Sequence, residues 1–197
     1  MKKYVTLFLS LIIILVLCSC DSKKSKTSTY YPVDSLIQAQ IEFLTESKAL
    51  LTKKAEINGA EEASTFAPKD SSAWAHELDI FAELNAINSP VNAGNYTVES
   101  GVRDSTSNLS IQLITGKPSL PIVYVKIFYL DALSKIRRIE ALYKEENSLL
   151  KGSRLLILEF QEINNKTVLV SYSIEGSQQM FLGDSVQFVV KGTIAIQ

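Results

Sequence analysis

The sequence has few of the residues from which catalytic and cofactor sites are usually built. Its 197 residues include two cysteines, one histidine and eight glycines. So few glycines disfavour a glycine-rich loop around a phosphate, and neither G-x-S-x-G nor H-E-x-x-H occurs. Twenty basic residues nearly balance 21 acidic ones, which gives no support for a nucleic-acid-binding face. We therefore expect no cofactor, no nucleic-acid partner and no enzymatic activity.

The sequence also lacks an apolar run long enough to cross a membrane. Lys2 and Lys3 precede an uncharged, almost wholly apolar segment from Val5 to Leu17, which is 13 residues long. A helix that crosses a bilayer needs about 20 residues. The positive start and the short apolar run favour a cleaved secretory signal over a permanent transmembrane helix.

Both cysteines follow this run, in the sequence Leu17-Cys18-Ser19-Cys20. This sequence resembles the lipobox of bacterial lipoproteins, which has leucine at position −3, a small residue at −1 and an obligatory cysteine at +1. Cys18 does not fit as that cysteine, because Leu17 is too large for position −1. The resemblance implies that signal peptidase II cuts between Ser19 and Cys20. It also implies a diacylglycerol on the sulfur of Cys20 and usually a further acyl chain on its amino group, enough for stable anchoring.

The lipobox divides the chain into three parts. Residues 1–19 are the expected signal, residues 20–31 the lipidated cysteine with a flexible tether, and residues 32–197 a single domain. Loss of the two lysines of the signal changes the formal charge from −1 to −3. Since lipid consumes the thiol of Cys20, we expect neither a disulfide nor a thiol nucleophile in the mature chain.

Residues 32–90 have helical patterns. Asp34 is positioned to cap a first helix, and apolar residues recur at helical spacing as far as Leu51. Asp70 is positioned to cap a second helix. Between the two, an Asn-Gly pair indicates a small hairpin.

Residues 91–197 have strand-like patterns, with alternating apolar residues and turn residues at short intervals. Strands that follow each other so closely pair antiparallel. Residues 135–146 fit a strand better than a helix, although both patterns are present. We therefore predict an α+β fold with two N-terminal helices packed on a C-terminal antiparallel meander of about five to seven strands. A curved half-barrel is one form that this sheet could take.

Two predicted strands, Ile122–Leu130 and Leu155–Phe160, are apolar on both faces, so both faces need cover. The helices can cover one face. On the other, the sheet either curls around its own core or forms a lipophilic groove. Half-barrel carriers and receptors of the lipoprotein-sorting pathway have such a groove, but no sequence motif links this chain to them. A partner protein or self-association is a further alternative.

Few side chains are candidates for chemistry. The only histidine, His76, lies within about 60° of Asp79 and Glu83 on the second predicted helix, which makes these residues a candidate metal site. The apolar residues of that helix occupy another arc, so a solvated polar stripe is the better interpretation. Three Asp-Ser steps resemble an O-glycosylation motif of exported proteins in one Gram-negative lineage, although turn and cap chemistry explains them equally well. The candidate acceptors are Ser35, Ser105 and Ser185.

These features resemble those of small envelope lipoproteins of Gram-negative bacteria. We predict a non-enzymatic binding or assembly module, held in the cell envelope by lipid on Cys20, with an envelope protein or a hydrophobic ligand as partner. The alternatives are a carrier or receptor for hydrophobic ligands and a carbohydrate-active enzyme with scattered carboxylates. We favour the outer membrane, although Asp21 at position +2 resembles an inner-membrane retention signal of some bacteria.

The anchor is tested by the substitution Cys20→Ser. We expect the variant to lose labelled palmitate, because serine has no sulfur to acylate, and to leave the membrane fraction on cell fractionation. A variant that stays membrane-bound and still incorporates palmitate would show that the lipobox interpretation is wrong.

Overall fold

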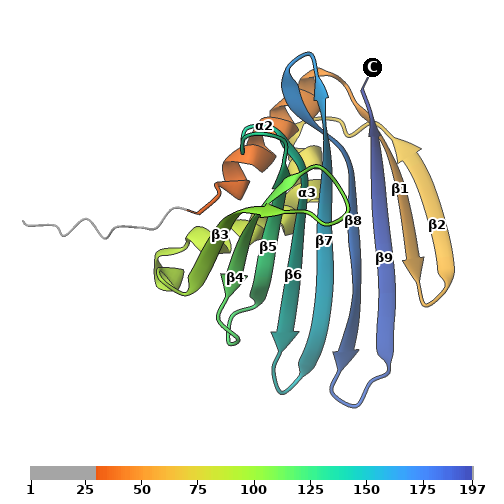
Figure 1. Ribbon diagram of the computed structural model, residues 1–197. Coiled ribbons are helices and arrows are strands. Elements are labelled where there is room, and N and C mark those ends of the chain that lie inside the picture. Colours follow the sequence, from red (N-terminus) through yellow and green to blue (C-terminus); the bar gives the residue numbers. More distant parts are fainter. Residues whose placement is uncertain (1–29, 197) are drawn as a thin grey trace, which may run out of the picture.

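The computed structural model describes residues 30–196, in which nine antiparallel strands form one open sheet (Figure 1). The strand order is β2-β1-β9-β8-β7-β6-β5-β4-β3, so β2 and β3 are the edges. Within these residues, no helix is long and apolar enough to cross a membrane. The helices are α2 Val33–Glu46, α3 Ser71–Ala82, η1 Glu83–Asn88 and η2 Pro90–Asn92. The strands are β1 Leu50–Ile57, β2 Ala60–Phe66, β3 Tyr96–Arg103, β4 Ser110–Gly116, β5 Ile122–Tyr129, β6 Ile136–Glu146, β7 Leu150–Ile163, β8 Lys166–Met180 and β9 Ser185–Ala195.

The predicted fold class is wrong. The sheet has nine strands instead of five to seven, and β1 and β2 lie within residues 32–90, which we expected to be helical apart from a small hairpin. β1 pairs with β9, from Leu50 opposite Ala195 to Ile57 opposite Phe188. The sheet therefore joins both ends of the domain, and it is not closed into a barrel. Pairing between segments so far apart in the chain leaves no trace in local periodicity.

Helix α2 is shorter than predicted. It ends at Glu46, well before Leu51, and Lys48 then adopts a left-handed φ of 48°. Leu51 is buried as expected, but from strand β1. A single buried position fits a strand as well as a helix, which explains the error. Asp34 is not the N-cap, because the helix begins at Val33 and has no side-chain cap bond.

Three other local predictions are confirmed. The Asp70 carboxylate accepts a hydrogen bond from the Ala73 N–H at 2.9 Å and caps α3. Asn58 and Gly59, with φ of 49° and 87°, make the tight turn between β1 and β2. Residues 136–146 form strand β6 and not a helix.

The helices pack on one face of the sheet and leave the other without helical cover (Figure 1). Across this covered face, Phe81 of α3 meets the ring of Tyr172 on β8 edge-on, with 5.6 Å between ring centroids. The Tyr172 ring lies against Gly192 of β9, where any side chain would collide with it. The largest fully buried side chains include Trp74, Phe81, Leu44, Leu51, Leu78, Leu84 and Ile87.

Gln40 fixes helix α2 to the start of strand β8. Leu169 and Thr167 pair with β7 on one side, but β9 pairs with β8 only from Ser171 onward, so this part of β8 has no strand partner on its other side. The buried Gln40 side chain supplies the partners. Its Oε1 accepts from the Leu169 N–H at 2.7 Å, and its Nε2 donates to the Thr167 carbonyl at 3.1 Å. One amide thus fixes the position of the helix on the sheet.

We expect Gln40→Met to lower the free energy of unfolding by about 1–3 kcal/mol, because the buried Leu169 N–H loses its acceptor. Urea unfolding measures the change. Gln38→Met is the matched control on the exposed face of α2, where only a bond to Glu42 is lost, and it should cost about 0.5 kcal/mol or less. Equal effects of the two substitutions would contradict this role of Gln40.

Candidate functional site

Two hairpins extend beyond the part of the sheet that the helices cover (Figure 1). β7 and β8 are 14 and 15 residues long. At about 3.3 Å per residue, β8 spans roughly 50 Å, whereas the 14 residues of α2 span about 21 Å. Ile174 of β8 still packs against the core, and the strand continues for six residues to Met180. The β6–β7 and β8–β9 turns lie at the end of this extension.

This end of the sheet exposes a group of apolar side chains, which we call the apolar tip. Leu149 of the β6–β7 turn is 68% exposed. Met180 at the end of β8 is 64% exposed, and Phe181 and Leu182 of the β8–β9 turn are 69% and 92% exposed. Large contiguous apolar patches are uncommon on proteins that do not bind anything there. The apolar tip is therefore the candidate functional site of the described residues.

One backbone hydrogen bond joins the two turns, and further bonds order each turn. The Phe181 N–H donates to the Leu149 carbonyl at 2.8 Å and so joins one turn to the other. Asn147 Oδ1 accepts from the N–H groups of Leu149 and Leu150, each at 2.9 Å. The Gly183 N–H donates to the Met180 carbonyl at 2.9 Å. The apolar side chains are thus displayed from a turn structure with defined partners.

The backbone of Leu182 adopts an unfavourable conformation. Its φ is 64°, in the left-handed region that a branched residue rarely occupies, at a cost of about 1–2 kcal/mol. The next residue, Gly183, could adopt the same conformation without that cost. The strain leaves the most exposed side chain of the apolar tip projecting into solvent. Strain of this kind is common at binding sites.

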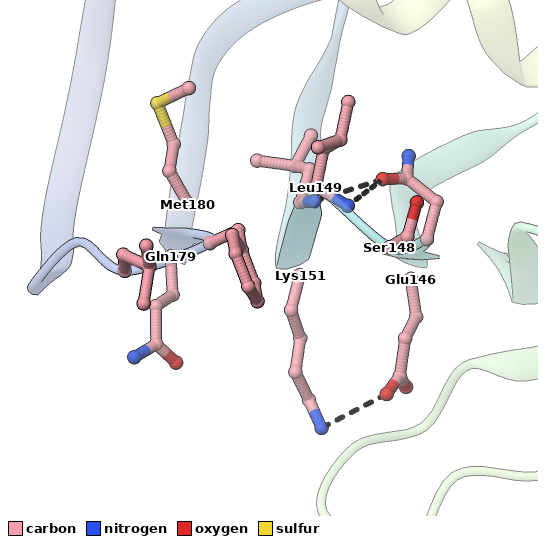
Figure 2. A pocket seen from close by; sticks show the side chains of 10 residues that line it. Glu146, Ser148, Leu149, Lys151, Gln179 and Met180 are labelled. Atoms are coloured by element: carbon pink, nitrogen blue, oxygen red, sulfur yellow. Dashed lines mark hydrogen bonds and ion pairs between the residues drawn. The ribbon is translucent and has the colours of Figure 1, made fainter.

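One ion pair lies at the flank of the apolar tip. Lys151 Nζ lies 3.3 Å from Glu146 Oε1, and both side chains are exposed (Figure 2). Between the two turns lies a shallow hollow of about 260 Å³, lined by the four residues of the apolar tip and by neighbours such as Ser148 and Gln179. Its openness and small size suit contact with a surface more than enclosure of a small ligand.

The candidate metal residues lie on the outer side of the helical layer. His76 and Asp79 are exposed on α3, and Glu83 is exposed at the start of η1. Among residues 30–196, no group of three or more histidine, cysteine, aspartate or glutamate side chains is arranged to hold a metal ion. The exposed positions fit the solvated polar stripe that we preferred.

The candidate glycosylation sites are all at the surface. Ser35 is exposed on α2, Ser105 in the β3–β4 turn and Ser185 at the start of β9. Asp104, which precedes Ser105, accepts hydrogen bonds from the hydroxyl groups of Ser107 and Thr106, and these bonds lower the pKa of its carboxyl group. Turn chemistry therefore accounts for Asp104, and glycosylation stays a prediction. The lipobox residues Ser19 and Cys20 lie outside the described residues.

A ladder of charges crosses the sheet face opposite the helices. Glu140 of β6 accepts from the Tyr124 hydroxyl at 3.0 Å and from Lys126 Nζ at 3.1 Å through one oxygen, and from Arg138 through the other. Arg138 also lies 3.6 Å from Glu159 of β7. Burial raises the pKa of the Glu159 carboxyl, against the opposing charge of Arg138. Both oxygens of Glu140 are engaged within the chain, as expected of cross-strand pairs that stabilise a sheet.

A second polar cluster lies between the helices and the sheet. Glu77 of α3 accepts from the Tyr172 hydroxyl and lies 2.7 Å from Lys53 Nζ on β1. Burial, the hydrogen bond and the charge of Glu77 raise the pKa of Tyr172. This cluster links α3 to two distant strands, so its role in the fold accounts for it.

Sequence reasoning missed the apolar tip. It noted only turn residues at short intervals in this part of the chain and did not identify the three apolar residues before Gly183 as a site. These residues are Met180, Phe181 and Leu182. An unbroken apolar triplet adjoining a turn was the available signal. The contribution of Leu149 depends on the pairing of two hairpins and could not be seen in the sequence.

The charge ladder leads to a prediction about how the stability of the protein depends on pH. Burial, the charge of Glu140 and its hydrogen bond raise the pKa of Tyr124 to about 12, above the usual value of about 10. The stabilisation from protonated Tyr124 is thus complete below pH 10 and is lost as the pH rises towards 12. Tyrosinate absorbance should show Tyr124 titrating late, and Glu140→Gln should bring its pKa closer to 10. Ionisation of Tyr124 together with the earliest tyrosines in the unmodified protein would contradict this.

Comparisons with known proteins identify no relative: no protein-family model, curated protein sequence or solved structure matches the chain significantly.

Proposed function

We propose that this protein is a lipid-anchored lipoprotein of the cell envelope that acts as a non-enzymatic binding module, with the apolar tip as its contact surface. The observation that carries the proposal is the group of four exposed apolar side chains on two hydrogen-bonded turns at one end of the sheet. The lipobox at Cys20 supports the membrane location. A binding module needs a preorganised surface, and the bonds within the apolar tip provide one.

The charged groups of the described residues support a binding role better than a catalytic one. Glu140 and Glu159 both contact Arg138 on the sheet, and Glu77 contacts Lys53 and Tyr172 beneath α3. Each carboxylate has partners within the chain that explain its position. The competing hypothesis of a carbohydrate-active enzyme therefore gains no specific support from them.

The hypothesis of a carrier for hydrophobic ligands placed a lipophilic groove on the face that the helices do not cover. That face carries the charge ladder of Lys126, Arg138 and Glu140, so it gives no support for an apolar groove. On the covered face, apolar side chains pack against those of the helices in one core, and a ligand there would have to displace packed side chains.

The proposal is tested by photo-crosslinking in cells. A benzophenone amino acid at Phe181 should give membrane-fraction adducts of increased mass, whereas the same group at Phe66, an exposed apolar residue of β2 at the opposite end of the sheet, should give few. Leu149→Ser and Leu182→Ser should together reduce the adducts at position 181 several-fold. Equal labelling from positions 181 and 66 would refute the apolar tip as the contact surface.

A further inference from the structure

We infer that the apolar tip inserts into the bilayer that holds the lipid anchor, so that the domain contacts the membrane at two points. The occupant of the site is thus a lipid surface. The inference rests on the proposed function and names the partner of the same site.

The side chains of the apolar tip have the chemistry of a lipid contact. Two leucines, a methionine and a phenylalanine protrude from the turns, and all four are more than 60% exposed. Protein interfaces draw most of their binding energy from tryptophan, tyrosine and arginine in fitted pockets. The apolar tip contains none of these three residue types. A hydrocarbon phase requires only apolar side chains that project outward.

The backbone of the apolar tip also suits an apolar medium. Backbone groups inside a bilayer find no water, so each one needs a partner within the protein. Asn147 accepts from Leu149 and Leu150, and Leu149 accepts from Phe181. Met180 accepts from the Gly183 N–H at 2.9 Å. These side-chain and backbone bonds reduce the cost of moving the turns out of water.

The charges near the apolar tip define how insertion depends on lipid. Lys151 and Glu146 pair with each other, and Asp184 adds a negative charge at an exposed position. This flank has no excess of basic residues, so attraction to anionic lipids cannot drive the contact. We therefore expect insertion into membranes of uncharged phosphatidylcholine.

The sheet register places the start of the domain near the level of the apolar tip. Tyr30 is fixed there, because its hydroxyl donates to the Tyr96 carbonyl at 3.1 Å and its N–H to Asn88 at 2.7 Å. Followed across the paired strands, Tyr96 of β3 lies level with Gly176 of β8. Met180 lies four residues further along β8, or about 13 Å.

The tether can therefore reach the membrane plane at which the apolar tip lies. Cys20 precedes Tyr30 by ten residues, which span at most about 35 Å. The level difference of about 13 Å is well within that reach. Five strand spacings of about 4.8 Å separate β3 from β8, so the anchor and the apolar tip would contact the bilayer about 24 Å apart. Two separated contacts fix the orientation of the domain, which a single point of attachment does not.

The anchor also makes a weak insertion sufficient. Four partly inserted side chains are comparable to a single acyl chain, which alone partitions with a constant of about 10⁴ M⁻¹. Tethering at an effective concentration in the millimolar range makes the inserted state about tenfold more populated than the free one. Without the anchor, the same contact is largely lost at a lipid concentration of about 10 μM, where the product of this constant and the lipid concentration is only about 0.1.

The test places an environment-sensitive NBD fluorophore at the apolar tip of the full lipidated chain. Leu182→Cys is labelled, and the protein is reconstituted in phosphatidylcholine vesicles that contain doxyl-labelled lipid. We expect a blue shift and several-fold quenching by doxyl groups near the headgroups. NBD at Phe66→Cys is the matched control, because Phe66 is an exposed apolar residue that pairs with Leu51 at the opposite end of the sheet, and it should not be quenched. Adding Leu149→Ser and Phe181→Ser should abolish quenching at position 182.

Each outcome decides between named alternatives. If the doxyl lipid does not quench the fluorophore at position 182, the inference is overturned. If that fluorophore is instead protected from quenching by aqueous iodide, and the protection rises with the amount of protein per vesicle, the occupant is a second copy of the chain. The Cys20→Ser chain separates this inference from the proposed function. If that variant still carries palmitate, the anchor assignment fails, whereas quenching at position 182 reports on the apolar tip alone. If Cys20→Ser lowers quenching about tenfold at about 10 μM lipid, both hold.

Discussion

The structure depends on a difference in length between its strands and its helices. α2 and α3 cover only part of one sheet face, while β7 and β8 continue beyond the core. Where the strands have helical cover, apolar side chains are buried, and Gln40 fixes the helix to the sheet. Where the strands extend past it, their turns carry exposed apolar residues on a framework of hydrogen bonds. One uncovered extension of the sheet thus provides the contact surface that the proposed function requires.

Local features of this fold could be predicted from the sequence, because they depend on neighbouring residues. The cap at Asp70, the Asn58-Gly59 turn and the strand over residues 136–146 are examples. The architecture could not be predicted, because β1 joins the sheet through β9, at the other end of the chain. That pairing converts part of the expected helical region into sheet. It also makes the real strand number larger than the C-terminal pattern indicates.

The candidate site, like the fold, has features that could be predicted from the sequence and features that could not. The solvated stripe around His76 follows from helical periodicity and agrees with the exposed positions observed. The apolar tip depends on the meeting of two turns about 30 residues apart, through the bond from Phe181 to Leu149. The second apolar face of the central strands proved to be a mixed surface, in which Phe128 is buried beside the charge ladder of Arg138 and Glu140. The pattern of apolar residues in the sequence identified the apolar side chains of that face, but it did not show that charged side chains lie beside them.

Hydrogen–deuterium exchange on the lipidated protein tests the central claim most directly. Exchange is compared between the chain on phosphatidylcholine vesicles and the same chain in a detergent that holds only the anchor. The account predicts slower exchange on vesicles in residues 147–150 and 180–184, with α3 and the β2 edge unchanged. Unchanged exchange in both turns, or protection centred on the β2 edge, would contradict it.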